Sequence, residues 1–595
     1  MDHHAGPHFQ IPAGSILVFV LISTALFLAL FDKFLFPKRN LTGKSLTPLQ
    51  RIGVGHMINF VSMGVSALVE SKRLIVAKSN EASLVGLTLA FGGLTSNLIV
   101  YLIKEFDVES IDAAQITNLV NGAGSLTPVV AAIVADSFLG CFSIIWISSI
   151  ISLLGAILLA LTTTVDSLRP TPCEVGSTSC TPKPNVQYVV LYAAIVLVTL
   201  GNASIRSTLA TMGANQFDKP KDQGVFFNWF FFFLSGSTIV ASTAIVYVED
   251  NVSWKAGYII CVAANVLGAA IFLLGTRFYN NSKPEGSPFT SLARVVVASI
   301  RKRKLPLPST SEDFYHGLML VEPSKTYSEG DVKPDGSTAK SWRLCSVQEI
   351  EDFKTLIKIL PLWSSSFFLG TTIGVQGSLS ILQALTMDRH IGPNFQIPAG
   401  SMLVFVMLST ALFLALFDKF LFPTWKNLSG KSLTPLQRIG VGHVLNFLCM
   451  GVSAIVESKR LNIAKYNQGS IIVPMSALWL VPQLALVGIA EAFHLPGQVS
   501  LYYQEFPITL KNLATAMISV LVGIAFYLTT ALIDVVRRTT TWLPGNINNG
   551  RLDKVYGVLV VGGVLNFGYY VICAWFYKYK SMKEVVDHSD SPSHE

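Results

Sequence analysis

Charged side chains are scarce in this sequence. Asp, Glu, Lys and Arg together make up 13% of the 595 residues, whereas 51% of the residues are hydrophobic. An ordinary soluble domain carries about 25% charged residues, and these are the residues least often buried without partners. A chain this long with so little charge must present much of its surface to lipid rather than to water. The composition therefore predicts an all-α membrane protein that crosses the bilayer many times.

Cysteine is also sparse, and the sequence lacks the cysteine patterns of redox and metal sites. The seven cysteines are scattered, without a C-x-x-C pair or a metal-ligand spacing. No Ser/His/Asp or Cys/His constellation stands out, and the phosphate-loop-like sequence at 430–432 lacks the earlier glycine that this motif requires. We therefore expect no enzymatic activity, no metal and no other cofactor. The net charge of +8 does not indicate nucleic-acid binding, because the basic residues lie mostly in loops, as the positive-inside rule predicts.

Apolar runs of about 20 residues predict transmembrane helices, and twelve such runs follow residue 82. They lie near 83–103, 114–135, 142–164, 186–208, 227–248, 255–276, 355–382, 397–421, 437–456, 472–500, 514–536 and 555–577. The only long loop is polar and contains four consecutive basic residues, from Arg301 to Lys304. This layout predicts an N-terminal six-helix bundle, a cytoplasmic linker, a C-terminal six-helix bundle and a cytoplasmic tail, at 81–276, 277–353, 354–579 and 580–595.

The basic linker also orients the chain. If the linker is cytoplasmic, the loop at 165–185 faces the outside. This short, Pro-rich loop contains Cys173 and Cys180, a pair that suits an extracellular disulfide. Two free loop cysteines are the alternative.

The first 80 residues repeat a later part of the chain. The sequence STALFLALFDKFLFP occupies 23–37 and, letter for letter, 409–423. The match extends over most positions of 1–80 and 387–467. An architectural repeat would recur at a regular period, whereas this unit occurs once, out of place and barely diverged. We therefore interpret 1–80 as a duplicated transmembrane hairpin, copied from the eighth and ninth core helices by a recent gene event or a fused gene prediction.

Two charges inside the predicted spans are candidate functional residues. Arg206 lies near the end of the fourth core span, and Glu491 lies inside the tenth. A charge at the bilayer centre costs about 2.5–3.5 kcal/mol on insertion scales, so such residues usually face a cavity. The alternatives are that Arg206 snorkels to the interface and that Glu491 forms a structural pair with a neighbouring helix.

Several motifs then occur in a recognisable order. They are ADSFLGCFSIIWISS at 135–149, GANQFDKPKDQGVFFNWFFFFLSGS at 213–237, LPLW at 360–363 and the helix of Glu491. Over about 81–580 the chain resembles the peptide and nitrate transporter family, also called the proton-dependent oligopeptide transporter family, of the major facilitator superfamily. ESIDAAQITNLVNG at 109–122 and EDNVSW at 249–254 are most similar to the plant nitrate excretion transporters within it.

The resemblance implies two six-helix bundles around a central cavity that opens alternately to each side of the membrane, with the substrate near the midplane. Asp136 matches the family's acidic residue in the second loop. It is expected to latch the cytoplasmic face by capping the next helix and binding a basic partner, or else to be a solvated loop acid. The candidate substrate-binding residues are Arg206, Glu491, Asn97, Tyr101, Asn228 and Gln376.

One departure from the family pattern affects the choice of substrate. The family's E-x-x-E-R motif aligns with Leu84–Thr88, which contains no carboxylate. Arg206 would therefore lack its neutralising glutamate, and a guanidinium that stays charged and offers planar, bidentate donors favours an anion. Nitrate is a planar monoanion, so we expect a plasma-membrane nitrate transporter, with Glu491 as the candidate proton site. A chloride, hormone or peptide carrier of the same fold and a non-transporting duplicate are the alternatives.

Overall fold

The computed structural model describes most of the chain after the repeat. The described residues are 74–170, 185–214, 220–278, 288–302, 342, 346–393, 395–467, 472–506 and 511–577. Most of the predicted duplicated hairpin, the Cys173–Cys180 pair and the side chain of Asn228 lie outside them, so those three interpretations remain predictions.

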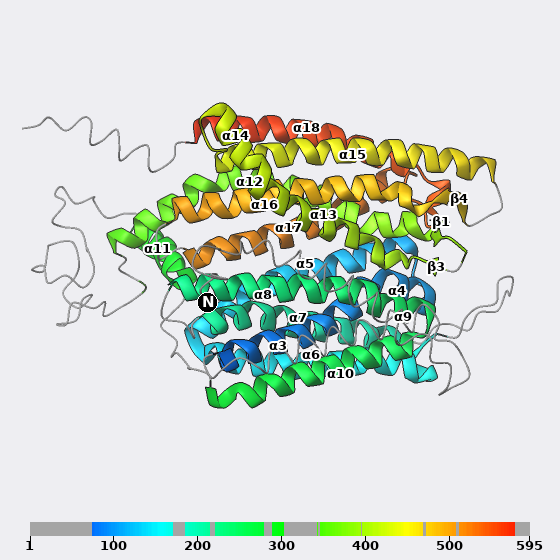
Figure 1. The fold of residues 1–595 in the computed structure, drawn as a ribbon, viewed down its shortest axis with the longest axis horizontal. Coiled ribbons are helices and arrows are strands. Elements are labelled where there is room, and N and C mark those ends of the chain that lie inside the picture. The colour runs from blue at the N-terminus through cyan, green and yellow to red at the C-terminus, as the bar shows by residue number, and fades with distance from the viewer. Residues whose placement is uncertain are drawn as a thin grey trace, which may run out of the picture.

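The N-terminal half is a set of packed helices (Figure 1). Their bounds are α3 (Leu74–Ser96), α4 (Leu98–Phe106), α5 (Ser110–Val134), α6 (Gly140–Thr164), α7 (Asn185–Ala214), α8 (Pro220–Val240), α9 (Val246–Asn251) and α10 (Trp254–Leu274). Helices α3 and α4 are bent by 49° at Asn97. Helix α3 begins before the predicted domain boundary at residue 80 and crosses it without a break.

The C-terminal half contains the remaining helices and four short strands. The helices are α11 (Pro288–Lys302), α12 (Val347–Leu385), α13 (Val404–Leu416), α14 (Phe422–Ser429), α15 (Pro435–Tyr466), α16 (Val481–Glu505), α17 (Lys511–Thr539) and α18 (Leu552–Phe576). The strands are β1 (Met387–Asp388), β2 (His390–Ile391), β3 (Phe395–Gln396) and β4 (Val473–Ser476). Strand β1 pairs in parallel with β4, and β2 pairs antiparallel with β3.

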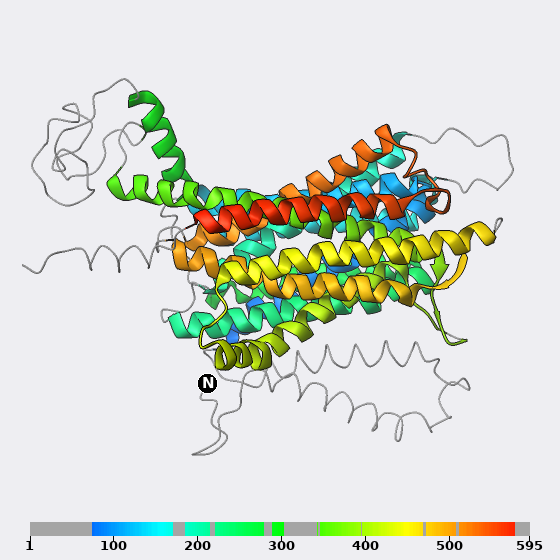
Figure 2. The same cartoon turned by 90° about the horizontal axis from the view of Figure 1, so that it is seen from above.

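Local sequence signals explain where two long helices begin. The side chain of Ser346 accepts a hydrogen bond from the backbone N–H of Glu349 (3.2 Å), whose carboxylate accepts one from the backbone N–H of Ser346 (2.9 Å). Thr434 and Gln437 form the same reciprocal pair at the start of α15, with Pro435 at the first helical position. Such capping boxes satisfy backbone donors that a helix start leaves unpaired. Figure 2 shows α11 projecting from the bundles beside the start of α12, where Arg294 pairs with Glu349 at 3.1 Å.

The helices are long and apolar enough to cross a membrane. Ten of those described pass this test, or eleven if the bent pair α3–α4 is counted as one span. One of the ten is a continuous stretch of 55 residues that contains both α5 and α6, far more than the roughly 20 residues of a single crossing. The all-helical membrane fold predicted from composition is confirmed.

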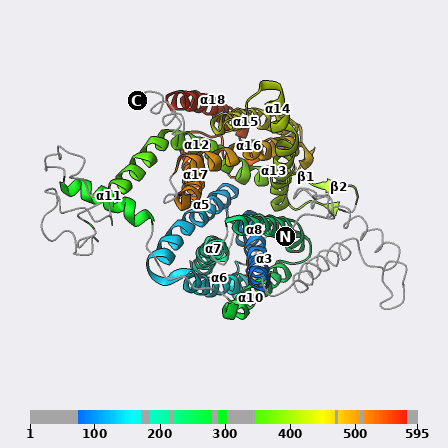
Figure 3. The same cartoon turned by 60° about the vertical axis from the view of Figure 1, so that its left-hand side comes forward.

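The helices form two groups that meet along a shared interface. Helices α3, α6, α7 and α10 pack together in one group, and α13, α15, α16 and α18 pack together in the other. Helices α5 and α17 pack against each other between the groups, as Figure 3 shows. Gly523 permits this approach, because a Cβ there would lie only 2.6 Å from Cγ of Leu126. The two groups are called the N-terminal and C-terminal bundles below.

Candidate transport site

Arg206 is an accessible cation on a mostly buried part of α7. Ile205, directly before it, and Thr208, two positions after it, are 1% and 2% exposed, whereas Arg206 itself is exposed. No described residue forms an ion pair or a hydrogen bond with its guanidinium. The guanidinium of Arg206 is thus exposed and has no partner among the described residues.

Apolar packing occupies the positions of the missing carboxylates. Leu84 and Leu87 are each 1% exposed and belong to the same core cluster as Ile205. The side chain of Asn202 donates a hydrogen bond to the backbone oxygen of Leu87 (3.0 Å), which holds α3 against α7 about one turn from Arg206. The first helix therefore offers Arg206 no acid at these positions.

Glu491 lies on α16, in a different bundle from Arg206. It is half-buried and accepts a hydrogen bond from the hydroxyl of Thr410 on α13 (3.2 Å). None of the described ion pairs includes it. The structure therefore gives Glu491 a neighbour on an adjacent helix and does not bring it together with Arg206.

Tyr101 and Gln376 are packed inside their own bundles. The Tyr101 hydroxyl shares a hydrogen bond with the Thr162 hydroxyl (2.7 Å), and its ring lies 5.0 Å from the ring of Tyr258. The Gln376 amide donates to Ser453 (3.0 Å). Both residues are at most 1% exposed, so they contribute to packing in this conformation.

Asp136 lies in a π-helical turn, Ala135–Leu139, between α5 and α6. Helix α6 starts without a side-chain cap, so Asp136 does not cap it in this conformation. The turn is completed by Gly140, which adopts a φ of +74°, a conformation that glycine takes at little cost. Among the described residues, Asp136 has no ion-pair partner.

A set of ion pairs that the sequence did not reveal joins the two bundles at one end. Arg389 pairs with Asp250 (3.3 Å), which also pairs with Lys104. Arg537 pairs with Glu109 (2.6 Å) and with Asp112. We call this the outer end, because the sequence predicts it to be extracellular; it carries α4, α9 and the strands (Figure 1).

Aromatic and local polar contacts support the same closure. The rings of Tyr247 and Phe395, from opposite bundles, stack at a centroid distance of 5.7 Å. Asp388, next to Arg389, contacts the ring nitrogen of His390 (2.7 Å) and accepts from its backbone N–H (3.1 Å). These hydrogen bonds from His390 lower the pKa of Asp388, so the loop keeps its charge and shape.

Three further charged residues were also missed. Arg460 and Glu457 form a fully buried pair on α15 (2.7 Å), which the amide of Gln383 extends by donating to Glu457 (2.6 Å). Glu249 on α9 is buried beside Asn97. The predicted spans ended at 248 and 456, one residue before each acid, so both acids were assigned to loops.

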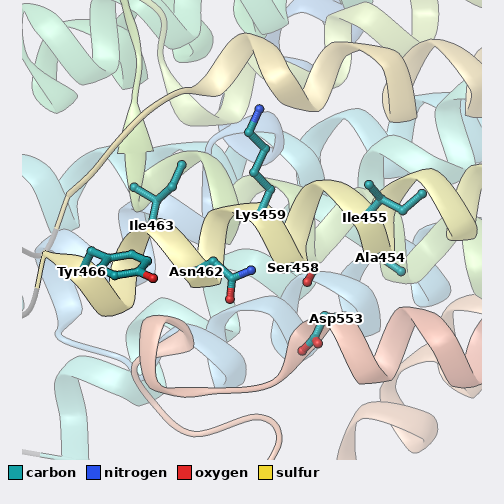
Figure 4. A pocket seen from close by; sticks show the side chains of 8 residues that line it. All are labelled: Ala454, Ile455, Ser458, Lys459, Asn462, Ile463, Tyr466 and Asp553. Atoms are coloured by element: carbon teal, nitrogen blue, oxygen red, sulfur yellow. The ribbon is translucent and has the colours of Figure 1, made fainter.

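A groove of about 570 Å³ lies on the C-terminal bundle between α15 and α18 (Figure 4). Lys459 and Asp553 are among its lining residues, but Lys459 lies over the ring of Trp479 (3.6 Å) and Asp553 pairs with Arg551 (2.9 Å). The groove includes none of the candidate substrate-binding residues. We assign no substrate to it.

Comparison with known proteins gives the family. A family model described as POT family matches residues 1–125 and 142–549. This protein belongs to the POT family. It is 52% identical over 517 residues to Protein NRT1/ PTR FAMILY 2.7 of Arabidopsis thaliana, covering 84% of this chain and 92% of that protein. It is 51% identical to Protein NRT1/ PTR FAMILY 2.6 of the same plant, covering 85% and 93%. The family resemblance predicted from the motifs is confirmed.

Solved structures show the same fold at low sequence identity. An auto-inhibited POT family peptide transporter matches with a TM-score of 0.63 and 15% identity, over 84% of this chain and 97% of that chain. The POT family transporter PepTSo matches with a TM-score of 0.63 and 16% identity, over 86% and 100%. The fold is that of these solved POT family transporters. The protein is therefore a multi-pass membrane transporter of the POT family and not an enzyme.

Proposed function

We propose that this POT family member is a secondary transporter of nitrate, located in the plasma membrane, that works by alternating access. Twelve spans in two six-helix bundles would enclose the substrate, with the 55-residue stretch of α5 and α6 supplying two of them. The proposal covers movement of nitrate in either direction. Protons are proposed as the coupling ion.

The observation that carries the nitrate proposal is the state of Arg206. It is exposed on a helix whose neighbouring residues are buried, and no described acid pairs with it. Leu84 and Leu87, which align with the two acids of the family motif, are apolar and 1% exposed. A guanidinium without a carboxylate partner binds an anion, and its planar fork matches the flat, three-oxygen geometry of nitrate better than it matches a spherical chloride ion.

The closure of the outer end supports alternating access. All the ion pairs that join the two bundles in the described part of the chain lie at that end. The side chains of Arg389 and Asp250 are only 10% and 6% exposed. The more exposed pairs of Arg537 each contribute little, about 0–1 kcal/mol. Contacts of this strength can be broken and remade as the bundles rock, which is what a transporter of this kind requires.

Nitrate uptake into proteoliposomes tests the proposal. Purified wild type should accumulate labelled nitrate, and chloride should compete less well. Arg206→Ala should lose most of this flux, and Arg206→Lys, which keeps the charge but not the fork, should retain part of it. A charge-assisted hydrogen bond contributes about 1.5–3 kcal/mol, so nitrate affinity should fall roughly tenfold to hundredfold in Arg206→Ala.

Arg538→Ala is the matched control. This exposed arginine pairs with Asp534 on its own helix, so its loss should leave nitrate flux unchanged. Equal nitrate affinity in wild type and in a folded Arg206→Ala protein would show that Arg206 is structural. Flux of chloride or a peptide without nitrate flux would reject nitrate as the substrate.

A further inference from the structure

A carboxyl group without a partner is buried where the two bundles meet at the outer end. Glu249 is 1% exposed, and neither of its carboxyl oxygens forms a hydrogen bond with a described residue. The Asn97 amide faces it, yet neither polar atom of Asn97 has a hydrogen bond of normal geometry with a described residue. The hydroxyls of Tyr258 and Ser401 are buried and unpaired in the same sense. Unpaired polar groups from both bundles therefore gather at one junction.

Other buried carboxyl groups in the described part of the chain are satisfied. Glu457 pairs with Arg460, Asp352 accepts a hydrogen bond from Gln348 (2.8 Å), and Glu505 accepts one from Tyr577 (2.7 Å). Glu249 has no equivalent. An ionised carboxylate without partners in an apolar interior costs several kcal/mol. The neutral acid avoids this cost. Its O–H group can also donate a hydrogen bond to the side-chain oxygen of Asn97.

The charged and titratable neighbours of Glu249 agree with a neutral form. Asp250 follows it in the chain, and Lys104 and Arg389 pair with Asp250 rather than with Glu249. The other titratable groups that face it are the hydroxyls of Tyr101 and Tyr258 and the thiol of Cys261. None of these is a cation, so nothing described at this junction compensates a negative charge on Glu249.

The C-terminal bundle closes over this junction. The turn Ala399–Leu403 contacts α4 and α9. Gly400 sits so close that a Cβ would lie 2.7 Å from the side-chain oxygen of Asn97 and 2.8 Å from the backbone oxygen of Ser96. Separation of the bundles at the outer end would withdraw this turn and admit water to Glu249.

We propose that Glu249 is a proton-binding site coupled to the outer gate: the bundles close over its protonated carboxyl group, and its ionised form favours the open state. On opening, the carboxyl O–H bond breaks, the proton passes to a water molecule, and the carboxylate is hydrated. On closing, the carboxylate takes a proton back from water. The inference rests on the alternating-access part of the proposed function and does not depend on nitrate as the substrate.

The sign of the pH dependence follows from linkage. The closed state binds this proton more tightly than the open state, so closing takes up a proton and raising the pH favours opening. One proton changes the ratio of closed to open protein by at most about tenfold per pH unit. Glu249→Gln keeps the shape and remains neutral at every pH, so it should stay closed.

Spin labels across the outer end test this in the full-length protein in nanodiscs. Val252 and Ile391 are exposed residues near the outer ends of the N-terminal and C-terminal bundles, and pulsed distance measurements between them report opening. Wild type should shift toward the longer distance as pH rises, and Glu249→Gln should keep the short distance throughout. Infrared spectra give a second readout, because the C=O band of a buried protonated carboxyl group should disappear in Glu249→Gln and persist in Glu249→Asp.

Two control variants show whether the pH response comes from Glu249 or from another titratable group. Glu351→Gln removes an exposed carboxylate that pairs with Lys354, and its label distance and infrared band should match those of wild type. His390→Asn removes the imidazole that contacts Asp388 at the outer end of the C-terminal bundle. Opening that persists in Glu249→Gln but disappears in His390→Asn would overturn the proposal, as would an unchanged infrared band in Glu249→Gln. Absence of nitrate flux in wild type would reject the proposed substrate and leave both readouts at Glu249 valid. If Glu249→Gln fails to fold, the Tyr258→Phe variant replaces it. The infrared C=O band assigned to Glu249 should shift in Tyr258→Phe, because Tyr258 faces Glu249, and an unshifted band would contradict the proposal.

Discussion

At the scale of single residues, the charged and ionisable residues on the helices of this transporter fall into two kinds. Glu457 and Arg460 satisfy each other within one helix and hold the outer end of the C-terminal bundle together. Arg206 and Glu249 have no such partners among the described residues. Charges of the first kind stabilise one arrangement of the protein, whereas an unpaired charge or a carboxyl group that can lose its proton responds to a ligand or to pH. The presence or absence of a partner thus distinguishes the charged residues that stabilise the fold from those that can respond to a ligand or to pH.

Restoring the missing carboxylate tests whether Arg206 is free to bind an anion. In Leu87→Glu the backbone of the new acid would lie beside Asn202, which is one turn from Arg206 along α7. Pairing with the new acid should weaken nitrate binding roughly tenfold to hundredfold, measured on purified protein. Leu87→Gln has the same size without the charge, and it should bind nitrate much more tightly than Leu87→Glu. Equal loss in both variants would point to disturbed packing instead.

At the scale of elements, apolar runs predicted the helices well because lipid contact requires them. Their ends were predicted less well. Helix α15 continues ten residues beyond the predicted limit at 456, and α9 continues to Asn251. Both extensions contain acids, and a sequence does not show whether an acid will be paired or buried. The outer gate was missed for a related reason: Asp250, Arg389 and Arg537 lie far apart in the chain, and only the packed bundles bring them close.

Gly400 gives a test of the gate at this scale. Gly400→Ala places a methyl group against Asn97 and Ser96 only when the outer end is closed. Overpacking typically costs about 1–3 kcal/mol, so the open state should gain population by roughly fivefold to a hundredfold, as measured by the label distance across the outer end. Gly377→Ala is the matched control, because a Cβ there meets no atom within 4 Å. A short distance retained in Gly400→Ala would show that the turn adapts.

At the scale of the whole molecule, the described cross-bundle ion pairs lie at one end only, so this conformation is closed at the outer end. The family and the helical membrane fold could be inferred from the sequence, because the motifs and the hydropathy are local. The relation between Arg206 and Glu491 could not, since they lie on different bundles and no described ion pair or hydrogen bond joins them. The number of residues between two positions does not show whether their side chains are in contact.

Substitution of Arg537 tests how much the ion pairs contribute to the equilibrium between the closed and the open outer end. Arg537→Gln removes its pairs with Glu109 and Asp112, both of which are partly exposed. The expected effect is a modest shift toward the outward-open state, about fivefold or less, seen as faster hydrogen exchange at the start of α5. High salt should produce a similar shift in wild type and little change in the variant. Arg538→Gln, whose partner is on its own helix, should show no shift.

The continuity of α3 across the end of the repeated segment has an evolutionary consequence. The residues LIVAK at 74–78 begin α3, and their counterparts LNIAK at 461–465 lie in the closing turns of α15. Two similar five-residue segments thus begin one helix and lie near the end of another. A helix accepts such a graft readily, because its hydrogen bonds run from each residue to a near neighbour and need no matching surface. If residues 1–80 are the copied hairpin that the sequence predicts, α3 would join it to the core without a separate linker.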